Sequence, residues 1–153
     1  MTTVRYRIEF WIFRTLSWVV VALPERAALG LCSLLGWFVG VVVGVRRVDT
    51  HQHLQIAFPE QDPAWRRRGA RGSYMHLARE GAMTIRLYRM LPEEIVRRTE
   101  VVGLEALRDA AARGSGAIVI SGHLGNWEIA AAAVAALHGC AWIEVIISLR
   151  WPS

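Results

Sequence analysis

Hydrophobic positions are concentrated in the first 45 residues of the chain. A first apolar stretch covers Phe10 to Leu23, and a second, Ala27 to Val45, contains no charge and ends at Arg46-Arg47. A helix of ~20 apolar residues is long enough to cross the ~30 Å hydrocarbon core of a membrane. We therefore predict that residues 1–47 form a membrane-anchoring domain.

The arrangement of these two stretches has three interpretations. Either the first stretch lies along the membrane interface while the second spans the bilayer, or both form a hairpin that dips into one leaflet around Pro24. The third interpretation is a pair of buried helices in a soluble core. More arginines follow the second stretch than precede it, which favours a cytoplasmic location for the C-terminal portion.

A polar stretch, Asp49 to Pro63, follows the apolar region and is interpreted as a linker and turn. Asp62-Pro63 then supplies an N-cap and a proline at the first helical position, so we predict a helix from about Ala64 to Leu91. Seven arginines and one acid, Glu80, lie on this helix between Arg66 and Arg89. The cluster is interpreted either as a solvated face or as a surface for phosphate or an acidic protein, with Arg67 and Arg71 as candidate binding residues.

The rest of the chain alternates between helical and β-branched segments. We predict helices over 93–98, 104–113 and about 126–138, an extended piece over 101–103, and strands over 117–121 and about 142–148. Strand, helix and strand in that order predict a right-handed crossover in a parallel sheet. The predicted fold class is therefore α/β, with residues 48–153 as a partial α/β domain after the membrane helix or helical hairpin.

Composition narrows the possible functions. The chain has 153 residues, 54% of them hydrophobic, and a formal net charge of +5. All basic residues are arginines, which a coding bias explains more simply than phosphate chemistry at every site. Neither cysteine has a partner at metal-ligand spacing, and His51, His53 and His76 are not expected to hold a metal. No P-loop or G-x-S-x-G motif is present, and no nucleic-acid partner is expected.

The candidate chemistry lies in the segment Gly122-His123-Leu124-Gly125-Asn126-Trp127-Glu128. His123 follows the predicted strand, and Glu128 falls in the first turn of the helix that Asn126 is expected to cap, so the two side chains can meet across the bend. A carboxylate near a helix N-terminus is favoured by the exposed N–H groups. Glu128 could then orient the imidazole and leave His123 as a general base.

The same segment also has a simpler explanation. The glycines, Gly122 and Gly125, would let a substrate approach the backbone. In the simpler case His123 satisfies only a turn hydrogen bond, and Glu128 is no more than a favourable charge at the N-terminus of a helix.

The motif GHLGNWE, preceded by VVGLEALRDAAARGSGAIVIS, resembles the lipid A late acyltransferases, a branch of the lysophospholipid acyltransferase superfamily. Arg46-Arg47 and the stretch HLQIAFPE over residues 53–60 are similar to the family's basic junction and its Asn-Leu…Phe-Pro-Glu stretch, although His53 replaces the usual Asn. The resemblance covers about residues 24–140. It places the family's catalytic histidine on His123 and its acidic partner on Glu128.

The resemblance implies transfer of a fatty acyl chain from acyl carrier protein or acyl-CoA to a hydroxyl of a lipid A precursor or related glycolipid, without a covalent acyl-enzyme. It implies no metal and no cofactor, and it places the protein at the cytoplasmic face of the bacterial inner membrane. The basic helix would bind either the phosphates of the anionic acceptor or the acidic carrier protein.

The family also continues beyond the last residues of this chain. Further strands and a substrate-binding arginine are expected there, so we interpret Ser153 as the end of a truncated or frame-shifted N-terminal fragment. Such a fragment would lack the acyl-chain pocket and part of the oxyanion stabilisation. The alternative function is a non-enzymatic, membrane-anchored fragment that binds lipid or protein through its arginine-rich helix.

Overall fold

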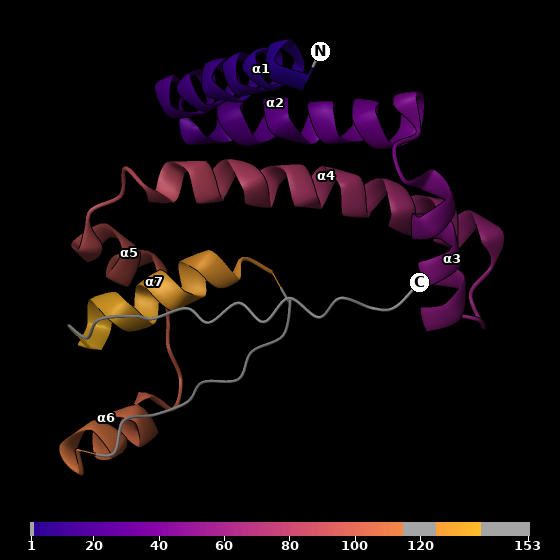
Figure 1. Ribbon diagram of the computed structural model, residues 1–153. Helices are drawn as coiled ribbons and strands as arrows, with labels where there is room; N and C mark the ends of the chain where they lie inside the picture. The colour runs from indigo at the N-terminus through magenta and orange to yellow at the C-terminus, as the bar shows by residue number, and fades with distance from the viewer. Residues whose placement is uncertain (1, 115–124, 139–153) are drawn as a thin grey trace. The chain divides into compact units, whose positions relative to one another are not determined.

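The computed structural model describes residues 2–114 and 125–138, and the chain divides into two compact units, Met1–Arg89 and Met90–Ser153 (Figure 1). The first unit contains α1 (Thr2–Ala22), α2 (Glu25–Trp37), the π-helix η1 (Phe38–Val43), α3 (Arg47–Ala57) and α4 (Pro63–Leu87). The second contains α5 (Pro92–Arg98), α6 (Leu104–Ala112) and α7 (Trp127–His138). The predicted domain boundary after residue 47 stays a prediction.

The predicted α/β fold class is wrong for the structure. Over residues 2–114 and 125–138 all regular elements are helices and no strand is present. The predicted extended piece at 101–103 is a turn, because Gly103 adopts a φ of +80°. The predicted strands at 117–121 and 142–148 lie outside the described residues, as does the crossover that required them.

η1 shows why a run of β-branched residues does not by itself establish a strand. Its sequence, FVGVVV, is as rich in β-branched residues as the segments interpreted as strands, yet it is helical. The strand preference of β-branched residues depends on their surroundings, and helix packing overrides it here. In the described part of the chain, a β-branched run can therefore form a helix.

The core of the first unit is built from small side chains. Val20 of α1, Ala28 and Cys32 of α2, and Ala82 of α4 are buried together. Partly buried hydrophobic residues surround them: Leu16, Leu23, Leu29, Ala78 and Ile85. Figure 1 shows α1, α2 and α4 stacked side by side. Small residues allow helix backbones to approach closely, which is also how helices pack in membranes.

Two glycines, Gly36 of α2 and Gly40 of η1, lie directly against α4. A Cβ added to Gly36 would overlap the Tyr74 carbonyl group and lie 2.7 Å from Cβ of Ala78. A Cβ added to Gly40 would overlap the ring of Tyr74. The spacing Gly36-x-x-x-Gly40 thus allows α4 to pack closely against α2 and η1.

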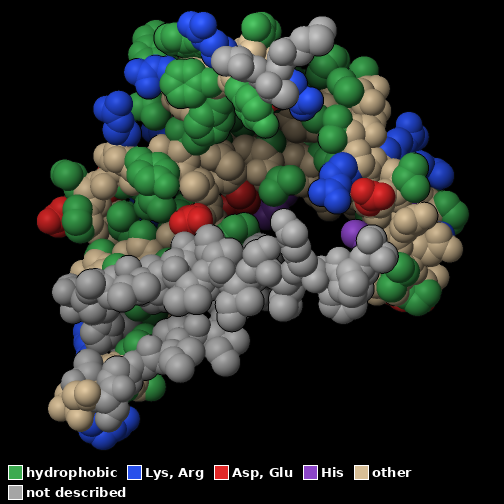
Figure 2. Space-filling model, viewed as in Figure 1, with side chains coloured by type: hydrophobic (Ala, Val, Ile, Leu, Met, Phe, Trp, Pro, Cys, Tyr) green, Lys and Arg blue, Asp and Glu red, His purple; other side chains and the backbone are tan. Residues whose placement is uncertain are grey.

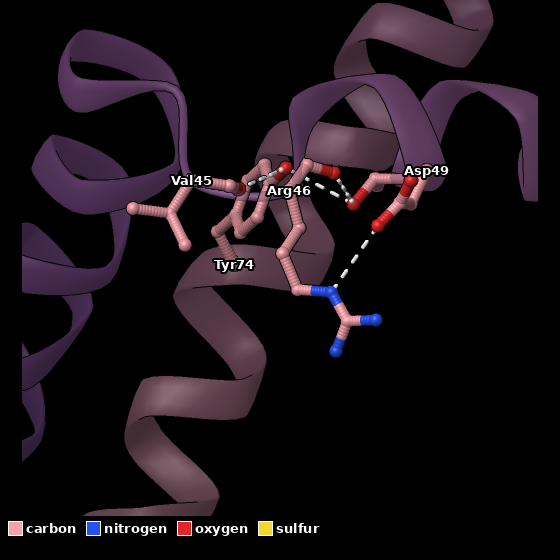
Figure 3. Close-up of polar contacts among 5 residues, drawn as sticks. Val45, Arg46, Asp49 and Tyr74 are labelled. Carbon is pink, nitrogen blue, oxygen red and sulfur yellow. Dashed lines mark hydrogen bonds and ion pairs between the residues drawn. The ribbon is translucent and has the colours of Figure 1, made fainter.

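The same tyrosine holds the end of the apolar region (Figure 3). Its hydroxyl lies 3.1 Å from the Val45 carbonyl oxygen and 3.0 Å from Oγ1 of Thr50, so it can donate its proton to either. Thr50 in turn donates to the Arg46 carbonyl oxygen at 3.0 Å. Gly44 has a φ of +77° and Arg46 a φ of +51°, and these two left-handed residues turn the chain between η1 and α3.

The predicted linker over 49–63 is wrong in its first part, since α3 occupies residues 47–57. This segment contains no proline or glycine before residue 59, and Leu54 packs over Gly69 of α4. Asp49 lies in the first turn of α3 and pairs with Arg46 at 3.3 Å. Only residues 58–62 form the turn.

The predicted start of α4 is confirmed. The Asp62 side chain accepts a hydrogen bond of 2.7 Å from the Trp65 backbone N–H, and Pro63 is the first helical residue. This hydrogen bond lowers the pKa of the Asp62 carboxyl group, so the cap is ionised at neutral pH. The helix ends at Leu87 rather than at about Leu91.

Arg86 joins the end of α4 to the end of α1. Its Nη1 donates to the carbonyl oxygens of Val20 at 2.7 Å and Leu23 at 3.0 Å. The last carbonyls of a helix have no partner within the helix and carry partial negative charge. A guanidinium group at this place therefore stabilises the packing of α1 against α4.

In the second unit, α5 packs against α7. Ile95 and Ala133 are buried. The predicted helices at 93–98, 104–113 and 126–138 are confirmed to within one or two residues. Pro92 begins α5, and Gly114 follows α6 with a φ of +70°.

Candidate functional site

The N-terminus of α7 carries the described part of the predicted catalytic motif. Asn126 caps the helix, since its Oδ1 accepts a hydrogen bond of 3.1 Å from the Ile129 backbone N–H. Gly125, immediately before it, adopts a φ of +64°, a conformation that side chains other than glycine rarely tolerate. Glu128 lies in the first turn of α7 and is half-buried. The predicted cap and the predicted position of Glu128 on the helix are confirmed.

The other two residues of the motif, Gly122 and His123, lie outside the described residues. The approach of His123 to Glu128 therefore stays a prediction. The Asn126 cap fixes where α7 begins and so fixes the backbone position of Glu128 in its first turn.

The arginines of the basic helix α4 fall into two groups, those that bind backbone carbonyls within the fold and those that are exposed. Arg66 donates hydrogen bonds to the carbonyl oxygens of Gln61 and, at 3.5 Å, of Phe58. These hydrogen bonds stabilise the turn over residues 58–62 that precedes the helix. Arg86 binds the end of α1, as described above. The other four arginines of α4 are exposed: Arg67, Arg68, Arg71 and Arg79. Arg89, two residues after the end of the helix, is exposed as well.

Arg67 and Arg71 are therefore available for a ligand. They lie one helical turn apart, so their guanidinium groups can reach the same anion. Their role as binding residues stays a prediction.

Metal-ligating residues do not gather in the part of the chain that the structure describes: no group of three or more His, Cys, Asp or Glu side chains could hold a metal ion there. His51 and His53 lie on α3, whereas His76 lies on α4 and pairs with Glu80 at 3.5 Å.

A large apolar surface covers α1, α2 and η1. Figure 2 shows hydrophobic side chains interspersed with arginines over the region of α1. On α1 the side chains of Trp11 and Trp18 are 59% and 72% exposed, and on α2 Leu34 is 60% exposed. One stretch, Glu25–Val43, is long and apolar enough to cross a membrane, judged by length and composition, and only 17% of it is buried within the structure.

Sequence analysis missed two of the contacts that shape this surface. The first is the packing of Gly36 and Gly40 on Tyr74, for which the G-x-x-x-G spacing was an available signal. The second is Arg86, which the sequence does not distinguish from the exposed arginines of α4. Nothing in the spacing of the arginines indicates that only this one reaches back to α1.

Exposed apolar helices, one of them long enough to span a bilayer, beside a basic helix are features of the class of membrane-associated proteins. Residues 1–142 match the family of bacterial lipid A biosynthesis acyltransferases, and the chain belongs to that family. The match includes the whole GHLGNWE segment and confirms the family resemblance. No curated protein and no solved structure matched the chain.

Proposed function

We propose that the chain transfers a fatty acyl group from acyl carrier protein or acyl-CoA to a hydroxyl of a lipid A precursor or related glycolipid. The family match, which runs through residue 142 and so includes the motif of residues 122–128, is the observation that carries this proposal. The proposed location is the cytoplasmic face of the bacterial inner membrane, with residues 1–47 as the anchor. The exposed apolar surface of α1 and α2 supports the anchoring role.

His123 is the proposed general base. It takes the proton of the acceptor hydroxyl as the hydroxyl oxygen attacks the thioester carbonyl carbon. The carbon–sulfur bond then breaks, an ester forms, and the proton passes to the departing thiolate to give the free thiol. Glu128 holds the imidazole in the orientation in which the nitrogen facing the substrate is unprotonated.

The residues around His123 have supporting roles in this proposal. Gly122 and Gly125 leave space for the two substrates next to the backbone, and the positive φ of Gly125 makes glycine the favoured residue there. Asn126 fixes the start of α7 and thereby the position of Glu128.

The direct test is acyl transfer by the full chain in detergent micelles. Radiolabelled acyl groups would be supplied on acyl carrier protein and, separately, on coenzyme A, with a phosphorylated lipid A precursor as acceptor. We expect a labelled, more heavily acylated glycolipid, since thioester hydrolysis alone would release free fatty acid. Release of fatty acid only, with either donor, would contradict the proposal.

A second function, binding of anionic lipid without catalysis, is favoured by one observation. Arg67 and Arg71 are exposed on one face of α4, whereas Arg66 and Arg86 are engaged within the fold. The same two arginines are the proposed binding residues for the acceptor's phosphates in the acyltransferase mechanism. Their contribution can be measured without turnover.

Reversing the charge of both residues, Arg67→Glu with Arg71→Glu, is expected to weaken binding of a phosphorylated lipid A precursor at least about 30-fold, because loss of the two attractions alone accounts for that factor. Each arginine contributes about 1 kcal/mol of attraction to anionic lipid, and about 1.4 kcal/mol corresponds to a tenfold change in affinity. Binding to the full chain would be measured by fluorescence in neutral detergent micelles, at low and high salt.

The matched control reverses Arg108 and Arg113, which are exposed on and just after α6. The net charge changes equally in both variants. Equal losses of affinity would show that only net charge matters, and α4 would then be merely a solvated face.

A further inference from the structure

We propose that the first unit lies in the plane of one membrane leaflet, with α1 and α2 toward the lipid and α4 toward water, so that no helix of this unit crosses the bilayer. The inference rests on the proposed membrane anchoring and adds how the helices are oriented relative to the bilayer. The proposed partner is a single membrane leaflet rich in anionic headgroups.

The first step is that α4 lies antiparallel to α2 and η1, along nearly the same axis. At one end Ala28 and Cys32 of α2 are buried with Ala82 of α4. At the other end Gly40 meets Tyr74, and the Tyr74 hydroxyl reaches the Val45 carbonyl. Because α4 follows α2 and η1 along their length, a membrane crossing by α2 would carry this part of α4 into the hydrocarbon core.

The second step is that α4 is polar on its other side. His76 and Glu80 lie two residues before and after Ala78, which faces α2, so at 100° per residue both fall on the opposite face. The two side chains are paired at 3.5 Å, and the exposed Arg79 lies between them in sequence. Charged side chains in membrane segments normally face the interior of a helix bundle. Here they face away from it, which fits water and not lipid.

The third step is that the surface on α1 and α2 fits lipid. Residues 4–15 of α1 are exposed, and bulky apolar side chains such as Phe10 and Phe13 are interspersed there with charged ones. The charged residues are Arg5, Arg7, Glu9 and Arg14. Arginines beside bulky apolar residues are typical of a helix that lies in the plane of the membrane interface. On η1, Val42 and Val43 are 56% and 59% exposed.

The fourth step concerns the two ends of the hairpin. Glu25 and Arg26 lie at the turn between α1 and α2, and Arg46 and Arg47 follow η1 at the far end. A hairpin that dipped vertically into one leaflet would bury the charged turn. A hairpin in the plane of the leaflet keeps both ends among the headgroups, where arginines are attracted to anionic lipid.

The test is cysteine labelling of the full chain in bacterial membrane vesicles of known sidedness. In a background in which Cys32 and Cys140 are replaced by alanine, single cysteines are introduced by Arg26→Cys, Arg47→Cys, Arg79→Cys and Val42→Cys. A membrane-impermeant maleimide is added to inside-out and to right-side-out vesicles, and labelling in detergent gives the reference for each variant.

We expect Arg26→Cys, Arg47→Cys and Arg79→Cys to be labelled from the same side, close to the detergent reference. We expect Val42→Cys to be labelled in detergent but not in vesicles. Labelling of Arg26→Cys and Arg47→Cys from opposite sides would show a crossing helix and overturn the inference. Failure of Arg26→Cys to react from either side would show a vertical hairpin and overturn it as well.

The readout does not depend on acyl transfer, so the two proposals fail separately. A catalytically active chain with a crossing helix would overturn only the in-plane geometry. Release of the full chain from the vesicles at high salt would overturn the anchoring role of residues 1–47, and the inference with it.

Discussion

Replacing His123 with alanine is expected to lower kcat for acyl transfer about 10²- to 10⁴-fold, the usual contribution of a general base. Without the imidazole, the acceptor hydroxyl must lose its proton to water as it attacks the thioester. KM for the donor is expected to change little, because the base acts on the acceptor. The measurement is initial-rate kinetics of the full chain in detergent micelles with each proposed acyl donor.

Two matched pairs separate this effect from general damage. His76→Ala removes an exposed histidine that pairs with Glu80 on α4 and is expected to retain activity. Glu128→Gln is expected to lower kcat, whereas Glu105→Gln, in the first turn of α6 instead of α7, is not. Turnover that survives in His123→Ala would remove His123 as the base.

Replacing Gly40 with leucine is expected to destabilise the first unit by about 3 kcal/mol, the upper part of the usual range for overpacking. Even a single Cβ at Gly40 would overlap the ring of Tyr74, so the larger side chain must push α4 away from η1. The Tyr74 hydroxyl would then lose its hydrogen bond to the Val45 carbonyl. Unfolding by denaturant in detergent micelles measures the change.

Gly30→Leu is the control for this substitution. Gly30 lies on α2, and no atom lies within 4 Å of a Cβ built there, so leucine should be tolerated. The double variant Gly40→Leu with Tyr74→Ala should recover part of the lost stability, because alanine vacates the space that leucine needs. Equal destabilisation by Gly30→Leu and Gly40→Leu would mean that the contact with Tyr74 does not set the packing.

Local signals in the sequence predicted the helix starts well. Asp62-Pro63 and Asn126 each combine a capping side chain with the residues that favour a first helical turn, and both begin a helix where expected. The 47–57 helix was missed because its polar composition resembles a linker. Its contact with α4, where Leu54 covers Gly69, joins residues that are far apart in sequence.

The error in fold class has a similar origin. Hydrophobic β-branched runs fit a buried strand and a buried helix equally well, and η1 shows that this chain uses one as a helix. Of the candidate site, the capping residue and the carboxylate on α7 could be placed from the sequence. The division of the arginines of α4 could not, because it depends on which of them reach backbone carbonyls elsewhere in the fold.

The contact between α2 and α4 also bears on how the protein is made. The helices α1, α2 and η1 are complete at Val43, but Leu87, the last residue of α4, is added 44 residues later. At ~5–20 residues per second, translation of that interval takes about 2–9 s. Until α4 has been made, Gly36 and Gly40 lack the helix against which they pack. The nascent hairpin must therefore be sheltered by a chaperone or delivered to the bilayer before its own partner helix exists, so the order of synthesis favours insertion first and assembly second.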